Sequence, residues 1–194
     1  MDISTDTVKA LRDKTGVSVM QCRKALEEAN GDVAQAEVIL RKKSGAAADK
    51  KADRELGAGA IGMYVHDNAI GAMVLLSSET DFVSKNEEFV ALAREIAMQV
   101  AATNPTYVGT DEIAEDAKEA ALAVFQKEVE GKPEEMKAQI LEGKLKSYFK
   151  DQVLLEQAYI KDEAKTVKDL VTEATQKFGE RIEVTKMARF SARG

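Results

Sequence analysis

The sequence is poor in cysteine and histidine, two residue types common in catalytic and metal sites. Its 194 residues include one cysteine, Cys22, one histidine, His66, and no tryptophan. A lone thiol cannot form an internal disulfide or a cysteine-based metal site, and any histidine site would have to be built around a single imidazole. We therefore expect no disulfide framework, no metal site rich in cysteine or histidine, and no conventional pairing of a nucleophile with a histidine.

Aromatic residues and long hydrophobic runs are also scarce. Phe, Tyr and Trp together make up 5% of the chain, which disfavours a stacking platform for single-stranded nucleic acid. No apolar run approaches the roughly 20 residues that cross a bilayer, and the N-terminus lacks a basic segment followed by an apolar one. These absences predict a cytoplasmic protein that has no membrane partner.

Charge of both signs is abundant and unevenly distributed. The formal net charge is −6, and this excess of acidic residues disfavours direct binding of nucleic acid. Residues 1–54 carry 11 basic and 9 acidic side chains, whereas residues 55–194 carry 17 and 25. The difference, +2 against −8, predicts two units with different surfaces.

The N-terminal region has the signals of three short helices. Gly16 ends the first, Ser18 with Gln21 three positions on forms a capping box at the start of the second, and Asp32 opens the third. An alanine-rich, charged segment without an apolar face follows, as expected of a linker. We therefore predict a three-helix domain over residues 1–45, a linker over 46–56, and a core domain over 57–194.

The second of these helices has two different sides. Cys22 shares its apolar side with Ala25 and Leu26, so we interpret Cys22 as a small core residue in preference to a reactive thiol. Met20 points about 160° away from Cys22 at helical spacing. Either a partner protein or the next domain of the same chain is then expected to contact Met20.

From residue 57 onward the pattern alternates between strands and helices. Two apolar runs separated by a His-Asp-Asn turn predict a β-hairpin over 60–65 and 69–76. Helices are expected over 86–102, 111–130, 134–150 and 167–178, and a closing strand over 181–191. Within that strand Phe190 is expected to be buried. Helices interleaved with a few antiparallel strands indicate an α+β fold.

Phe82 lies where the second apolar run of the hairpin gives way to the next helix, in the segment Thr80-Asp81-Phe82-Val83. Two interpretations of the ring are open at this point. It is tucked back beneath the loop, or it is an exposed anchor for a partner. Spacing alone does not separate the two.

Several segments resemble the bacterial elongation factor Ts family. LLSSETDFVSKNEEF, residues 75–89, is similar to the Thr-Asp-Phe-Val motif of that family, and TGVSVMQCRKALEEANGDVAQA, residues 15–36, is similar to its ubiquitin-associated-like (UBA-like) three-helix domain. GAIGMYVHDNAIGAMV and the closing RIEVTKMARF extend the resemblance, which runs from Val8 to Phe190. The pattern matches the short form, which has one core module where longer members have two.

The resemblance implies a guanine-nucleotide exchange factor for elongation factor Tu that is not an enzyme, carries no cofactor, and binds neither nucleotide nor metal itself. It assigns the displacement of the partner's Mg²⁺, and disturbance of its phosphate site, to Thr80, Asp81, Phe82 and Val83. It assigns partner binding to Arg12, Val19, Met20 and His66. By analogy with the duplicated core of longer members, two chains would pair as a homodimer.

Two other classes of function stay open at this point. An adaptor or scaffold would use the three-helix domain to bind a partner and leave nucleotide release unchanged. A hydrolytic enzyme built on His66 is disfavoured because no nucleophile or metal-ligand cluster stands near it in the sequence. From the residues alone, a hairpin-turn histidine in water is favoured for His66 over a contact with a partner.

Overall fold

The computed structural model describes residues 3–129 and 133–192. Internal contacts divide the chain into two compact units. The first contains the described residues up to Ile61, with Leu75–Ala93 and Asp169–Val184, and the second contains Gly62–Val74, Arg94–Lys168 and the described residues from Thr185 onward. The domain boundaries expected from the sequence, at residues 45 and 57, stay a prediction.

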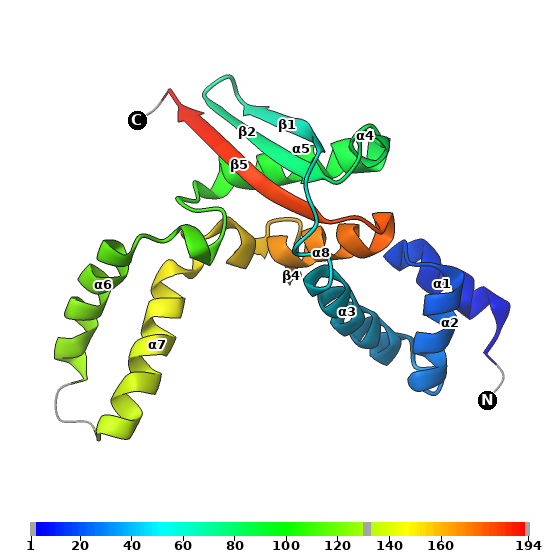
Figure 1. The fold of residues 1–194 in the computed structure, drawn as a ribbon, viewed down its shortest axis with the longest axis horizontal. Helices are drawn as coiled ribbons and strands as arrows, with labels where there is room; N and C mark the ends of the chain where they lie inside the picture. The colour runs from blue at the N-terminus through cyan, green and yellow to red at the C-terminus, as the bar shows by residue number, and fades with distance from the viewer. Residues whose placement is uncertain (1–2, 130–132, 193–194) are drawn as a thin grey trace. The chain divides into compact units, whose positions relative to one another are not determined.

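Three N-terminal helices are followed by a region in which groups of helices are interleaved with strands, and the colours of Figure 1 trace this order along the chain. The helices are α1 Thr5–Thr15, α2 Val19–Glu28, α3 Val33–Asp49, α4 Asp81–Ser84, α5 Glu87–Thr103, α6 Glu115–Glu128, α7 Glu134–Lys150 and α8 Val167–Phe178. The strands are β1 Ala58–His66, β2 Ile70–Ser78, β3 Ala158–Tyr159, β4 Asp162–Thr166 and β5 Ile182–Ser191. The predicted α+β class is confirmed. Among the described residues, no helix is both long and apolar enough to cross a bilayer.

The predicted starts of the second and third helices are confirmed by their caps. The Ser18 hydroxyl accepts a hydrogen bond from the backbone N–H of Gln21 at 3.4 Å, and the Asp32 carboxylate accepts one from that of Gln35 at 3.0 Å. Gly16 ends α1 in the left-handed conformation, with φ of 68°. Helix α3 continues to Asp49 and so includes the first residues of the segment expected to be a linker.

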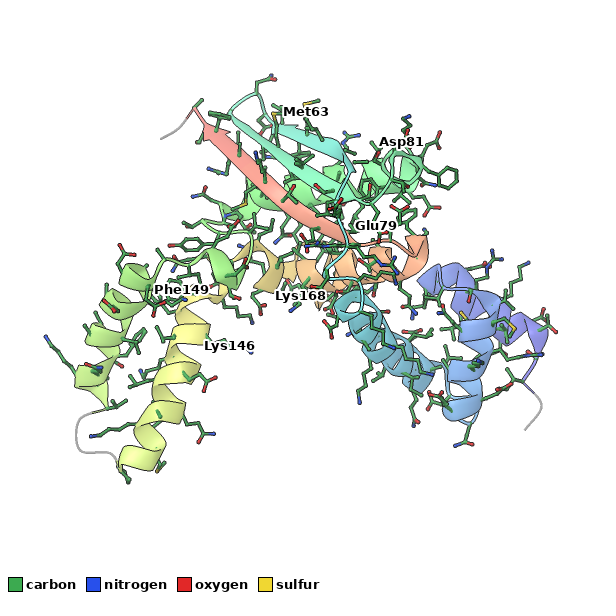
Figure 2. All side chains as sticks on the ribbon, in the orientation of Figure 1. Met63, Glu79, Asp81, Lys146, Phe149 and Lys168 are labelled. Atoms are coloured by element: carbon green, nitrogen blue, oxygen red, sulfur yellow. The ribbon has the colours of Figure 1, made fainter. Side chains whose placement is uncertain are left out.

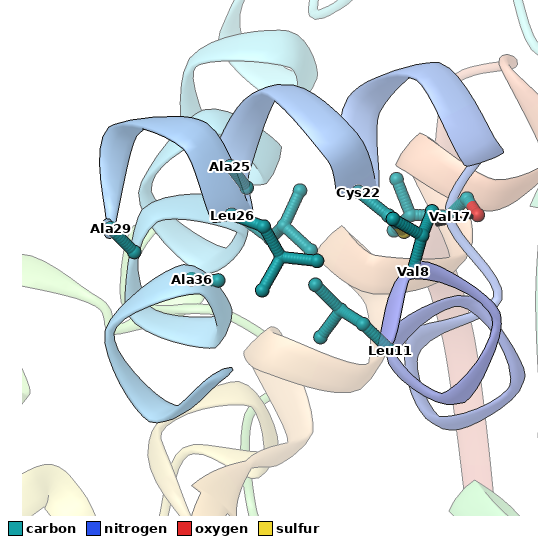
Figure 3. Packing of buried hydrophobic residues seen from close by; sticks show 9 residues of the cluster. Val8, Leu11, Val17, Cys22, Ala25, Leu26, Ala29 and Ala36 are labelled. Atoms are coloured by element: carbon teal, nitrogen blue, oxygen red, sulfur yellow. Dashed lines mark hydrogen bonds between the residues drawn. The ribbon is translucent and has the colours of Figure 1, made fainter. Parts of the chain in front are cut away.

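The three N-terminal helices enclose an apolar cluster of their own (Figure 3). Cys22 lies within it, fully buried, and its thiol points to the Val17 carbonyl at 3.5 Å. The interpretation of Cys22 as a core residue is therefore confirmed. The buried members of the cluster are Val8, Leu11, Val17, Cys22, Ala25, Leu26, Ala29, Ala36 and Leu40.

The described strands form two sheets. Strands β1, β2 and β5 lie in that order in one sheet, and β3 pairs with β4 antiparallel in the other. The predicted β1–β2 hairpin is confirmed, and its turn places Asp67 and Asn68 at φ of 49° and 55°. Two consecutive positive φ values are typical of a turn whose twist matches the flanking strands.

The region before α6 differs from the sequence prediction. A helix was expected to begin at residue 111, but the chain makes a short 3₁₀ turn at Thr110–Glu112 and α6 begins at Glu115. The reason lies in two local contacts: Glu112 accepts a hydrogen bond from the Val108 N–H at 2.6 Å, and Ile113 is buried in extended conformation. Glu130, the last residue of the expected helix, lies outside the described residues.

Phe190 is exposed, so the expectation that it is buried was wrong. The neighbouring side chain explains the direction. The Arg189 guanidinium donates from Nε to the Ala101 carbonyl of α5 at 3.0 Å. Successive side chains of a strand point to opposite faces, so Phe190 points away from α5.

Candidate partner-binding site

The segment between β2 and α5 presents one aromatic ring to solvent. Thr80 has an extended backbone, and Asp81–Ser84 form the single turn of α4. Phe82 is 86% exposed, whereas Val83 is 4% exposed. The alternative in which the Phe82 ring is tucked beneath the loop is therefore excluded. Val83 supports the turn from within.

The polar groups of Thr80, at the base of this turn, all have partners. The Glu180 carboxylate accepts from the Thr80 N–H at 3.0 Å and from its hydroxyl at 2.6 Å. The Ser78 hydroxyl donates to the Thr80 carbonyl at 3.0 Å, and the Ser84 N–H donates to the same carbonyl at 3.3 Å. The N–H, the carbonyl and the hydroxyl of Thr80 therefore all form hydrogen bonds.

Glu79, next to Thr80 and labelled in Figure 2, joins three chain segments. Its carboxylate accepts from the Arg181 N–H at 2.6 Å and from Arg54 Nη1 at 3.1 and 3.3 Å. The Arg181 guanidinium also donates to the Arg54 carbonyl. The Arg181 N–H, followed by the Arg54 guanidinium and the Lys51 charge, lowers the pKa of Glu79 despite partial burial.

Asp81, on the exposed side of the turn, pairs with Lys85 one helical turn later. The Lys85 ammonium lies 2.6 Å from the Asp81 carboxylate, and both side chains are exposed. This hydrogen bond, together with the Lys85 charge, lowers the pKa of Asp81. A charged rim therefore stands beside the Phe82 ring.

The residues expected to bind a partner through the three-helix domain are all on its surface. Arg12 is exposed near the end of α1. Val19 and Met20 open α2 and are 50% and 68% exposed. Their neighbour Val17 is buried in the cluster of Figure 3, so the apolar surface at the start of α2 consists of Val19 and Met20.

His66, the remaining predicted contact, belongs to the second unit. Its ring stacks on Tyr64, with Tyr64 Oη 3.2 Å from His66 Nδ1, and His66 Nε2 lies 3.5 Å from Asp67 Oδ2. The same two rings line a largely apolar cavity of about 400 Å³ together with Ile70, Met98 and Ile160. None of these neighbours is a serine, threonine or cysteine nucleophile. Within the described residues, no group of His, Cys, Asp or Glu side chains is arranged to hold a metal ion.

Comparison with known proteins identifies the family. A sequence model of the family described as Elongation factor TS matches residues 47–193. The chain is 46% identical over 191 residues to Elongation factor Ts of Thermodesulfovibrio yellowstonii, covering 98% of this chain and 96% of that one. It is 45% identical over 192 residues to the protein of that name in Thermosipho melanesiensis, covering 97% and 98%, and 44% identical over 191 residues to the one in Thermotoga maritima, covering 98% and 96%. The chain belongs to the elongation factor Ts family of translation elongation factors.

Proposed function

We propose that this chain is a guanine-nucleotide exchange factor for elongation factor Tu and that the Phe82 turn promotes release of GDP. The observation that supports the proposal most is the Phe82 ring, 86% exposed on a turn whose base is fully hydrogen-bonded. Aromatic side chains, phenylalanine among them, bury a large apolar area and dominate the energetics of interfaces. In this role the chain makes and breaks no covalent bond, so it is not an enzyme.

The mechanism acts on the partner's metal site. Mg²⁺ and the phosphates of bound GDP neutralise one another, so displacing the metal leaves the nucleotide charge uncompensated and speeds its departure. We propose that Phe82 wedges into the partner near that metal and disturbs the loop around the β-phosphate, with Thr80, Asp81 and Val83 as the rest of the turn. The coupling is reciprocal: if this chain weakens the binding of GDP to the partner, bound GDP weakens the binding of this chain by the same ratio.

The energy available from one ring is sufficient for this coupling. A phenylalanine buries about 150–250 Å² at an interface, which at about 25 cal/mol per Å² corresponds to at most about 4–6 kcal/mol. Coupling free energies between two sites are typically about 1–3 kcal/mol. The ring can therefore drive exchange even after part of its burial energy is offset by movement of the partner's side chains.

The remaining predicted residues supply binding at other points. Arg12, Val19 and Met20 are exposed side chains of the helical domain, one basic and two apolar, and are suited to docking on the same GTPase. His66 and the apolar cavity beside it suit a further contact with the partner. We assign these four residues to affinity, and the Phe82 turn to the exchange step.

We also propose that two chains pair through the three-stranded sheet. Met63 and Val65 occupy alternate positions on β1, opposite to Tyr64, which lines the cavity with Met98 of α5. Met73 of β2 and Phe190 of β5 are also exposed, and we infer that the four side chains share one apolar face; the exposed fractions of Met63, Val65, Met73 and Phe190 are 61%, 64%, 41% and 73%. Apolar side chains gathered in this way mark interaction surfaces.

The function is tested by stopped-flow release of labelled GDP from elongation factor Tu. The proposal predicts that the wild-type chain accelerates release and that Phe82→Ala does so much less. An adaptor or scaffold would bind elongation factor Tu and leave the release rate at its spontaneous value. If the wild-type chain binds elongation factor Tu without accelerating GDP release, the exchange function is wrong and the adaptor role takes its place.

A further inference from the structure

We infer that Glu180 is a positioning residue, whose carboxylate fixes the Thr80–Val83 turn so that Phe82 is presented in one orientation. Glu180 follows Gly179, at the end of α8, and is half-buried. It lies 100 positions from Thr80 in the sequence and is outside the resemblance motifs described above. The inference rests on the proposed function of Phe82 and adds to it a residue that does not itself touch the partner.

The turn depends on its attachments because it is too short to hold itself. Helix α4 has four residues and no side-chain cap, and a single helical turn is unfavourable in isolation since nucleation fixes several dihedral angles for one hydrogen bond. Its orientation is therefore set at its two ends. Val83 holds one end by burial, and Thr80 holds the other by hydrogen bonds.

At the Thr80 end, Glu180 supplies two of those bonds. Its two carboxylate oxygens accept separately from the backbone N–H and the hydroxyl of the same residue. In the described part of the chain, that N–H has Glu180 as its only partner. Hydrogen bonds to an ionised acceptor are roughly twice as strong as neutral ones. Loss of the carboxylate thus frees the backbone and the side chain of Thr80 together.

The neighbouring residues repeat the arrangement in the opposite direction. Glu79 accepts from the Arg181 N–H, while Glu180 accepts from the Thr80 N–H. We call these two reciprocal contacts, made by Glu79, Thr80, Glu180 and Arg181, the glutamate clasp. Because each two-residue segment supplies one carboxylate and one backbone donor, the clasp fixes the two segments in a single register.

A held turn lowers the cost of binding. Ordering a mobile loop and its side chain at an interface consumes part of the interaction energy, whereas a turn already in its bound orientation avoids that loss. Removing the clasp should therefore raise the concentration of factor needed for half-maximal GDP release. The maximal rate should be preserved, because Phe82 itself is intact once bound. If Glu180 had a purely structural role, its loss would lower thermal stability without raising the half-maximal concentration at an unchanged maximal rate.

The first test uses the free, full-length chain. Amide hydrogen exchange of Thr80 is followed by NMR in wild type, Glu180→Ala, Glu180→Gln and a control, Glu119→Ala, which removes an exposed glutamate of α6. We expect exchange of the Thr80 amide to become about tenfold faster in Glu180→Ala, the equivalent of one charge-assisted hydrogen bond. Glu180→Gln, which retains one acceptor oxygen, should be intermediate, and Glu119→Ala unchanged. An unchanged rate in Glu180→Ala would overturn the inference.

The second test measures GDP release from elongation factor Tu over a range of factor concentrations, at a temperature where each variant is folded. Glu180→Ala should raise the half-maximal concentration about tenfold, and the same change in a Thr80→Val background should have less effect because the two residues act as a pair. Release curves identical to wild type, alongside a clear defect in Phe82→Ala, would overturn the positioning role and leave the exchange function intact. If Phe82→Ala itself released GDP normally, the proposed function would be wrong and the positioning role would fall with it.

Discussion

Phe82 and Val83 are consecutive residues with opposite environments: the Phe82 ring lies in solvent, and the Val83 side chain is buried in the protein. The single turn of α4 carries both. A substitution at either position changes the same short segment, but the two changes should affect different properties. This separation allows partner contact to be distinguished from structural support.

Phe82→Ala should reduce exchange and leave stability nearly unchanged. Because the ring is exposed, the free energy of unfolding should stay within roughly ±0.5 kcal/mol of wild type. The coupling between the factor and GDP should weaken by about 1–3 kcal/mol, which is most of a coupling of typical size. Thermal melting and stopped-flow GDP release measure the two quantities. A large fall in melting temperature would contradict the assignment of Phe82 to contact with the partner.

Val83→Ala is the matched variant and should behave in the reverse way. Removing buried methyl groups costs their transfer free energy and leaves a cavity, together about 2 kcal/mol of stability. At a temperature where the variant remains folded, its maximal rate of GDP release should be close to that of wild type. Chemical denaturation checks the first expectation. A Val83→Ala protein of full stability would contradict the packing role.

Asp81→Ala should act more weakly than Phe82→Ala and in a salt-dependent way. Its carboxylate is exposed and already paired with Lys85, so it stands at the rim of the proposed contact. Rim charges affect mainly the rate of association, and their influence falls as salt screens them. We expect a defect in GDP release at low ionic strength that disappears by roughly 0.5 M salt. A defect that is equal at all salt concentrations would indicate a direct contact at the centre of the interface.

The local signals of the sequence predicted most of the fold. Ser18 and Asp32 cap their helices as expected, since a helix start depends on a few adjacent residues. Helix α7 begins and ends at the predicted residues, and the β1–β2 hairpin follows from two apolar runs around a short turn. The prediction that Phe190 is buried was wrong, because strand alternation identifies two faces without saying which one is covered.

The support of the candidate site could not be predicted in the same way. From spacing alone the exposed ring was one of two interpretations, the family resemblance favoured it, and the exposed fraction of the Phe82 side chain decides it. Glu79, Glu180 and Arg181 were missed because their hydrogen bonds join positions about 100 residues apart. A glutamate beside a glycine carries no local sign of such a contact. The strand pair β3–β4, two and five residues long, was equally too short to leave a pattern.

Glu79 should make stability depend on pH in the acid range. Its folded-state pKa is lowered, first by the Arg181 N–H and then by Arg54. A lowered pKa adds stability that is fully present above the unfolded value of about 4.3 and is lost as pH falls through the folded value. The difference in unfolding free energy between wild type and Glu79→Gln should therefore shrink below about pH 4. Urea denaturation at several pH values measures it, with the exposed Glu119→Gln as control. A difference that stays constant from neutral to acid pH would contradict the assignment.

The exposed sheet face gives the last prediction. If two chains pair through Met63, Val65, Met73 and Phe190, a charge at its centre should separate them, because an unpaired charge cannot be buried between apolar faces without a large cost. We expect wild type to sediment as a dimer and Met63→Lys to sediment as a monomer at the same concentration. Met136→Lys, which adds the same charge at an exposed methionine of α7, should leave the dimer intact. Wild type that sediments as a monomer at every concentration up to about 100 μM, where a dimer with a dissociation constant of about 1 μM would predominate, would contradict pairing through this face.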